Sequence, residues 1–213
     1  MPARLRPTAP NAADVILVGD PGRALLLAQG LLGEPKMSNH ARGLWGYSGR
    51  TAAGHELTIQ STGMGGPSAA VVLGDLAELG VRRAVRIGSC TALDEGWAPG
   101  ELAIVGAAHA VGPGTSRPDP KLTGALAHQL GEGAREAAVA SLDVIYRPGS
   151  VPPGEGEVAD MQTAAVFSRG GELGVAVAAV LIVAEAEAGA LPDAELEEAA
   201  RRAGEAAAAV LST

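Results

Sequence analysis

Apolar runs of strand length alternate with segments of helical composition along almost the whole chain. Strands are predicted at residues 15–18, 56–62, 82–89, 101–111, 139–146 and 175–185, and helices at residues 23–32, 66–80, 121–136, 158–174 and 192–212. Strands this apolar must be covered on both faces, and their alternation with helices favours parallel pairing. The pattern predicts an α/β fold in which a mixed, mostly parallel central sheet has helices on both sides.

We expect a single domain over residues 1–213. The chain is 47% hydrophobic and 19% charged, which is ordinary for a globular protein, and no linker or charge block divides it. The ligand site of such a sheet is expected beyond the carboxyl ends of its strands, where strand-to-helix turns gather.

Charge and composition narrow the possible partners. The formal net charge of −8 argues against nucleic acid or an anionic membrane surface as the main partner. The longest apolar run, residues 173–184, is too short to span a bilayer, and the N-terminus lacks the apolar core of a signal peptide. One cysteine, Cys90, fits a reducing compartment. We therefore expect a cytoplasmic protein without a membrane partner.

The turn GDPGR at residues 19–23 joins the first predicted strand to a helix. Glycine lets backbone N–H groups approach a ligand, a helix N-terminus favours an anion, and the Arg23 guanidinium suits phosphate. Taken alone, the turn is better explained as an ordinary strand-to-helix connection that ends in an exposed arginine, because short Gly/Pro turns are common.

A second glycine-rich turn, STGMGGPSAA at residues 61–70, again lies between a strand and a helix. It is neither a P-loop, which needs Gly-Lys-Ser/Thr, nor a dinucleotide fingerprint. A backbone cradle for a ligand and close packing of helix against strand both remain open.

The segment RIGSCTA at residues 86–92 places Arg86 inside an apolar strand, where an unpaired charge is costly. Arg86 therefore either pairs with an acid or meets an anionic ligand at the strand's end. Ser89 and Thr91 supply hydroxyls to the same turn. Cys90 is interpreted as a small buried side chain, since no histidine lies near it in sequence.

In a fourth segment, Asp160, Met161 and Gln162 fall inside a helical pattern. By itself this pattern suggests a core methionine beside a solvated polar face. His40, His55, His109 and His128 are scattered singly, so no metal-ligand spacing is present and no metal is expected.

The order and spacing of these turns resemble the nucleoside phosphorylase family, which includes uridine phosphorylase and hexameric purine nucleoside phosphorylase. GDPGRA resembles the GDPxR phosphate loop, and NHARG at residues 39–43 resembles the segment that lends an arginine to a neighbouring subunit's site. Residues 62–92 resemble the stretch that ends at a second phosphate-binding arginine. LIVAEAEAGALP echoes the VIVxxxxxxIP of uridine phosphorylases, and the resemblance runs from residue 14 to residue 211.

The resemblance implies a site for inorganic phosphate as co-substrate. Carried over residue by residue, Gly19, Arg23, Arg86 and Ser89 bind phosphate, and Arg42 completes the site from a partner chain. The resemblance further implies a homo-oligomer, at least a dimer that shares its sites and possibly a hexamer. No cofactor is implied. Three arginines around one nucleophile favour phosphorolysis over hydrolysis, because the nucleosidase relatives activate water.

On the nucleoside side, Met161 and Gln162 are expected against the ribose and Thr91 beside the ribose or base. Arg86 and Glu185 are the candidate catalytic residues. The family's Glu-Met-Glu motif is replaced here by Asp160-Met161-Gln162, and Glu185 follows the last strand, near the place of an aspartate that protonates the base in purine enzymes.

Other departures from the family also fall on the base side. The segment 145–157 offers Ser150 and Pro152 in place of a Gln and an Arg that read uracil, and the segment that follows it is much shorter than in uridine enzymes. The N-terminal histidine that reaches a neighbouring subunit's site has no match in residues 4–10.

Three hypotheses follow for the function. The first is phosphorolytic cleavage of a nucleoside to free base and (deoxy)ribose 1-phosphate, uridine phosphorylase-like or of the purine type. The second is a paralogue that binds phosphate or a nucleoside with little or no catalysis. The third is a nucleosidase, which would release base without phosphate.

Overall fold

The chain folds around one large mixed sheet, shown by a computed structural model that describes residues 4–111, 114–148, 150 and 154–213. At its centre, β1 (Asp14–Val18) lies between β4 (Glu56–Ser61) and β5 (Arg83–Ala92), parallel to both. β5 also pairs in parallel with β10 (Ala176–Ala186). The predicted parallel centre and the α/β class are confirmed.

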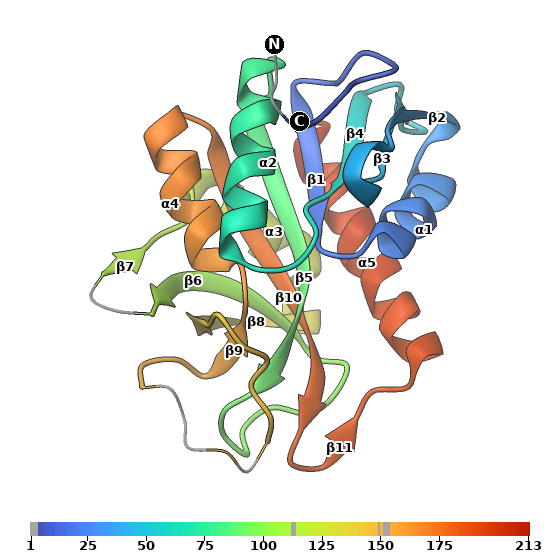
Figure 1. The fold of residues 1–213 in the computed structure, drawn as a ribbon. Helices are drawn as coiled ribbons and strands as arrows, with labels where there is room; N and C mark the ends of the chain where they lie inside the picture. Colours follow the sequence, from blue (N-terminus) through green and yellow to red (C-terminus); the bar gives the residue numbers. More distant parts are fainter. Residues whose placement is uncertain (1–3, 112–113, 149, 151–153) are drawn as a thin grey trace.

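The remaining strands are β2 (Gly33–Asn39), β3 (Gly46–Arg50), β6 (Leu102–Ala110), β7 (Thr115–Ser116), β8 (Ala134–Ser141), β9 (Val158–Asp160) and β11 (Gly189–Ala190). Antiparallel β2 and β3 extend the sheet beyond β4. On the other side, β10, β6, β8 and β9 pair in turn, and β9 pairs back with β5. These five strands close into a ring, which occupies the lower half of Figure 1.

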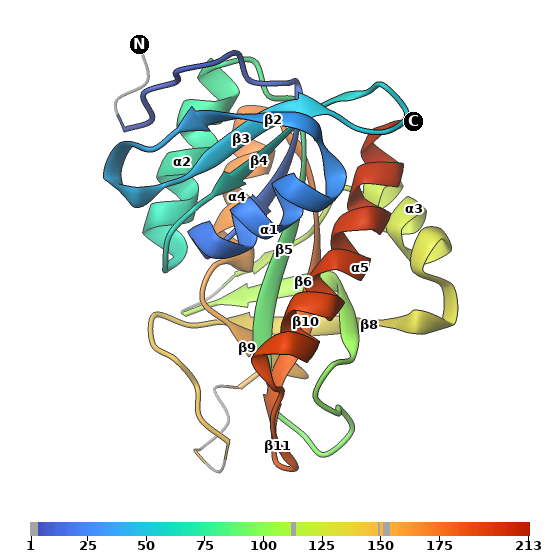
Figure 2. The ribbon, with the colours of Figure 1, turned by 90° about the vertical axis from the view of Figure 1, so that its right-hand side faces the viewer.

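Helices cover both faces of the sheet, as predicted. α2 (Gly66–Glu78) and α4 (Thr163–Leu173) pack on one face. α1 (Pro21–Leu31), α3 (Pro120–Leu130) and α5 (Asp193–Leu211) pack on the other. Figure 1 shows the two groups on opposite sides, and in Figure 2 α1 and α5 lie in front of the sheet.

Small side chains let these layers approach closely. α5 buries a row of alanines, and a Cβ added to Gly204 would lie 2.7 Å from Cδ2 of Leu27 on α1. A larger residue at position 204 would therefore push α5 away from α1. Close packing of this kind accounts for a chain that is rich in Ala and Gly and only 2% aromatic.

Two predicted helices were too long. The helix predicted at 121–136 ends at Leu130, and residues 134–141 form β8, paired in parallel with β6. Alanine-rich sequence favours a helix, but pairing within the sheet overrides this local preference. The strand predicted at 139–146 accordingly ends at Ser141.

The helix predicted at 158–174 begins only at Thr163. Residues 158–160 form β9, so Asp160, Met161 and Gln162 lie on a strand end and a connection rather than on a helix face. Their placement matters for the site because they enter the pocket from the start of α4.

Sequence signals at several helix starts agree with the structure. Asp20 caps α1 by accepting a hydrogen bond from the backbone N–H of Arg23 at 2.7 Å, and Pro21 opens the helix. The closing helix begins at Asp193, one residue after its predicted start, with Pro192 before it. No helix in the described part of the chain combines the length and the apolar character needed to cross a bilayer.

Candidate active site

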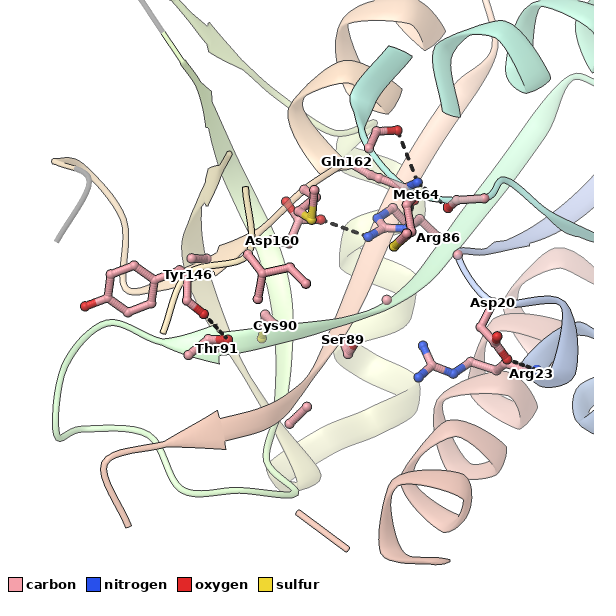
Figure 3. A pocket seen from close by; sticks show the side chains of 18 of the residues that line it. Asp20, Arg23, Met64, Arg86, Ser89, Cys90, Thr91, Tyr146, Asp160 and Gln162 are labelled. Atoms are coloured by element: carbon pink, nitrogen blue, oxygen red, sulfur yellow. Dashed lines mark hydrogen bonds and ion pairs between the residues drawn. The ribbon is translucent and has the colours of Figure 1, made fainter. Parts of the chain in front are cut away.

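A cavity of about 620 Å³ lies where β1, β5 and β10 end and the following turns gather. Its volume is within the range of about 300–1,000 Å³ typical of small-molecule sites. Eight of the predicted site residues line it, namely Gly19, Arg23, Arg86, Ser89, Thr91, Met161, Gln162 and Glu185. Segments far apart in the sequence therefore converge on one pocket, shown in Figure 3.

The Arg23 side chain extends from the first turn of α1 toward β5 near Ser89 (Figure 3). Among the residues that the structure describes, none accepts a hydrogen bond or forms an ion pair with its guanidinium. Burial and the neighbouring Arg86 lower the pKa of Arg23, and Asp20 acts in the opposite direction. Arg23, in the first turn of α1, and Arg86, on β5, line the same cavity and make this end of it favourable for an anion.

Arg86, with 4% of its surface exposed, is held by three partners. Its Nη2 forms an ion pair with Oδ2 of Asp160 at 2.8 Å, Nη1 donates to Oε1 of Gln162 at 2.7 Å, and Nε donates to Oγ1 of Thr163 at 3.1 Å. Of the two readings that the sequence left open, the structure shows the pairing with an acid. Three of the five N–H donors are used, which leaves two for a ligand.

Asp160 is itself fixed from several sides. Ser141 Oγ donates to Oδ1 at 2.5 Å, and the Thr163 hydroxyl and backbone N–H donate to Oδ2 at 2.6 and 3.0 Å. The carboxylate thus joins β8, the first turn of α4 and Arg86 on β5. This network fixes the guanidinium in place without a contribution from any ligand.

Gly88 makes room for the Arg86 side chain. A Cβ added there would lie 2.6 Å from Nη2 of Arg86 and 2.7 Å from Cδ2 of Leu181. Only glycine lets the guanidinium lie against β5 in this position.

The second glycine-rich turn forms another wall. Gly63 and Gly65 adopt positive φ angles of 71° and 81°, which glycine tolerates best. Met64 between them is 80% exposed and lines the cavity. The side-chain amide of Gln162 donates to the carbonyls of Gly63 and Gly65 at 2.6 and 3.2 Å, so both interpretations hold in part: the turn packs closely and still faces the pocket.

Ser89, Cys90 and Thr91 continue the wall along β5. Ser89 is exposed, whereas the Cys90 thiol is buried and lies 3.5 Å from the carbonyl of Ile182. Burial raises the pKa of Cys90 far above its ordinary value, with a further contribution from Asp160. The thiol therefore stays protonated and buried, as the sequence suggested.

Glu185 reaches the cavity because β10 is irregular there. The register with β5 shifts between Val183, opposite Cys90, and Glu185, opposite Thr91. A bulge of this kind re-aims side chains, and both Ala184 and Glu185 line the pocket. Since Arg86 and Thr91 are five residues apart on an extended strand, about 16 Å separates the two ends of the site.

Arg42 does not line this pocket. It is exposed in a short 3-10 turn, η1 (Ala41–Gly43), with a φ of 58°. Its role in a partner's site stays a prediction. Ser150 is exposed and its carbonyl accepts from the Tyr146 hydroxyl at 2.9 Å, whereas Pro152 lies outside the described residues.

Several lining residues were missed by sequence reasoning, namely Asp20, Met64, Ile145 and Tyr146. Asp20 could have been found from its place before Pro21 at a helix start, and Met64 from its place between two glycines. Ile145 and Tyr146 carry no such signal, because only the fold brings their loop to β5. In the described residues, no three His, Cys, Asp or Glu side chains are grouped as a metal site would need.

Comparison with known proteins adds a family and a fold. The sequence profile described as "Phosphorylase superfamily" matches residues 14–213. The chain is 39% identical over 85 residues to a "Purine nucleoside phosphorylase DeoD-type" of Oceanobacillus iheyensis, and 36% identical over 98 residues to one of Streptococcus pneumoniae. These alignments cover 39% and 46% of this chain but only 36% and 41% of the relatives' lengths.

One similar solved structure is a purine nucleoside phosphorylase from Toxoplasma gondii in complex with immucillin-H. Its TM-score is 0.84 over 95% of this chain and 91% of that chain. At 20% sequence identity this similarity shows a shared fold.

Proposed function

Because the chain belongs to the phosphorylase superfamily, we propose that it cleaves the N-glycosidic bond of a purine nucleoside with inorganic phosphate. The products are the free base and a pentose 1-phosphate, and no metal or organic cofactor takes part. The observation that carries the proposal is the Arg23 guanidinium, which enters the cavity beside Arg86 without a partner among the described residues. The purine preference rests on the names of the relatives in two bacteria.

Phosphate is placed between Arg23, Ser89 and the two unused N–H groups of Arg86. Its charge offsets the mutual repulsion of the two guanidinium groups, so bound phosphate and the site stabilise each other. The Asp160 network fixes Arg86 beforehand, which leaves little reorganisation for the reaction itself.

In the reaction, a phosphate oxygen attacks C1′ of the pentose while the C1′–N bond breaks. The electron pair of that bond goes to the base nitrogen, and the positive charge that develops on the sugar is balanced by the phosphate. Positioning and electrostatic stabilisation supply most of the catalysis. Glu185, on β10 opposite Thr91, lies toward the other end of the cavity from Arg86 and is the candidate acid that protonates the departing base.

We place Arg42 in the site of a second subunit, within a homo-oligomer. The exposed position of Arg42 outside its own pocket fits this role. Mixing two inactive variants, Arg23→Ala and Arg42→Ala, tests it. Shared sites predict that the mixture regains activity, because some sites combine an intact Arg23 with a partner's Arg42. A mixture as inactive as its components would exclude sharing.

The activity is tested by base release from inosine, adenosine, methylthioadenosine, uridine and thymidine, each with and without phosphate. The proposal predicts release from purine nucleosides that requires phosphate and is lost in Arg23→Ala. Release from uridine or thymidine alone would replace the purine assignment by a pyrimidine one. Release without phosphate would mean a nucleosidase, and saturable phosphate binding without any release would mean a binding paralogue.

A further inference from the structure

Every hydrogen-bonding group of the Gln162 side chain contacts another group of the protein. Its Oε1 accepts from Arg86 Nη1 at 2.7 Å and lies 3.0 Å from Thr62 Oγ1, whose single proton is shared between Oε1 and the Val18 carbonyl oxygen, also 3.0 Å away. Its Nε2 donates to the carbonyl oxygens of Gly63 and Gly65 at 2.6 and 3.2 Å. An amide has two acceptor sites and two donors, and here all four face protein groups, with both donors taken by the glycine carbonyls.

The surroundings fix the orientation of this amide. Reversing it would set Oε1 against two carbonyl oxygens and Nε2 against the Arg86 guanidinium, so these three contacts would become repulsive. Only the Thr62 hydroxyl, which also lies 3.0 Å from the Val18 carbonyl oxygen, could accept from the reversed amide. Only 3% of the residue is exposed, so water does not offer substitutes for these partners. The two carbonyls belong to glycines with positive φ, and that of Gly65 also accepts from the backbone N–H of Ala69 at 3.3 Å.

We propose that Gln162 is a positioning residue that fastens the Gly63–Gly65 turn to Arg86, and that it does not bind the hydroxyls of the substrate's sugar. This inference rests on the proposed function and departs from the role expected for this position from the family resemblance. Through Gln162, the turn after β4 and the guanidinium on β5 move as one wall of the anion end of the pocket (Figure 3).

The chemistry of the position explains why it holds an amide. A glutamate could accept from Thr62 and Arg86 as Gln162 does, but its ionised carboxylate has no donor for the two glycine carbonyls. With Asp160 already paired to Arg86, a second carboxylate would also give the cluster a net negative charge beside the anion site. The neutral amide avoids both costs.

The test uses Gln162→Ala and Gln162→Glu, with Ser168→Ala, an exposed position on α4, as the matched control. Three quantities are measured in the full chain. They are amide hydrogen exchange in peptides that contain residues 62–66, the calorimetric affinity for inorganic phosphate alone, and the ratio of kcat/KM for inosine to kcat/KM for 2′-deoxyinosine.

We expect both Gln162 variants to exchange about tenfold faster in residues 62–66, because each loses the two bonds to the glycine carbonyls. Phosphate affinity should fall about tenfold in Gln162→Ala and further in Gln162→Glu. The ribose-to-deoxyribose ratio should stay within about twofold of the wild-type ratio in Gln162→Ala, since no sugar contact is lost. Ser168→Ala should match the wild type throughout.

Unchanged exchange and phosphate affinity in Gln162→Ala would overturn the positioning role. A ribose-to-deoxyribose ratio that collapses toward one in that variant would show that Gln162 binds the 2′-hydroxyl. That result would overturn the claim that Gln162 does not contact the sugar. If the wild type cleaves no nucleoside, the proposed function fails, while exchange and phosphate binding still decide what Gln162 does.

Discussion

Breaking the ion pair between Arg86 and Asp160 should cost a large part of the protein's stability. The Asp160 side chain is fully buried and that of Arg86 is 5% exposed, so Arg86→Met leaves a carboxylate in the interior without its counter-ion. Removing one partner of a buried pair costs about 3–5 kcal/mol of unfolding free energy. We expect the lower end, about 3 kcal/mol, because Asp160 keeps its hydrogen bonds from Ser141 and Thr163.

The assay is urea unfolding of Arg86→Met, Asp160→Asn and the double variant, followed by circular dichroism. A loss of about 3 kcal/mol corresponds to a fall in Tm of about 6–12 °C for a chain of this size. The double variant should cost less than the sum of the singles, by at least about 1.5 kcal/mol, because it leaves no unpaired charge.

An exposed ion pair provides the control. Arg50 and Glu56 pair on the surface, with side chains 64% and 65% exposed, so Arg50→Met should cost no more than about 1 kcal/mol. If Arg86→Met costs as little as Arg50→Met, or if the double variant equals the sum of the singles, then burial does not make the Arg86 pair special and the reasoning is wrong.

Three further outcomes are expected. Arg23→Gln should leave the urea midpoint unchanged, because the Arg23 guanidinium has no partner among the described residues. The same variant should weaken phosphate binding about tenfold in calorimetry, because a charged donor to the anion is lost. A large loss of stability in Arg23→Gln would contradict the first expectation. Gly88→Ala should lower the free energy of unfolding by about 1–3 kcal/mol and weaken phosphate binding, because the added Cβ displaces Arg86. As the control, Gly30 has open space where a Cβ would lie, so Gly30→Ala should be neutral or stabilising in the same unfolding assay. Equal effects of the two would refute the steric argument. Because burial raises the folded-state pKa of Cys90, its thiol ionises first in the unfolded chain as the pH rises. The free energy of unfolding should therefore keep its full value below about pH 9 and fall above it by up to about 1.4 kcal/mol per pH unit. Urea midpoints between pH 8 and 10.5 should diverge between the wild type and Cys90→Ala, and parallel curves would contradict the assignment.

The sequence determined the central architecture. Its apolar runs at residues 15–18, 56–62 and 175–185 lie within a residue of β1, β4 and β10, since strands buried on both faces need continuous apolar sequence. The runs at 15–18 and 56–62 lead directly into the two glycine-rich turns. Because parallel strands end at the same edge of a sheet, this pattern was enough to place the GDPGR turn and the wall of β5 together.

Local sequence failed where tertiary pairing opposed local preference. Residues 134–136 were predicted as the end of a helix, but they form the start of β8 because β6 offers a parallel partner and a covered face. The closure of β5, β10, β6, β8 and β9 into a ring also depends on pairings between segments far apart in the chain, which no periodicity encodes.

In the site, too, sequence and tertiary structure each determine a different part. The sequence, through its resemblance to the nucleoside phosphorylase family, selected eight residues that line the cavity, and for the glycines, arginines and hydroxyls at strand ends the chemistry of the residues pointed the same way. Only the tertiary structure decided how they are used. Asp160 forms an ion pair with Arg86, and the Gln162 amide donates its hydrogen bonds to the Gly63–Gly65 turn. A bulge in β10 directs Glu185 into the pocket. Those roles depend on distances of about 3 Å between groups some 75 to 100 residues apart, which hydrogen-bond geometry fixes only after the chain has folded.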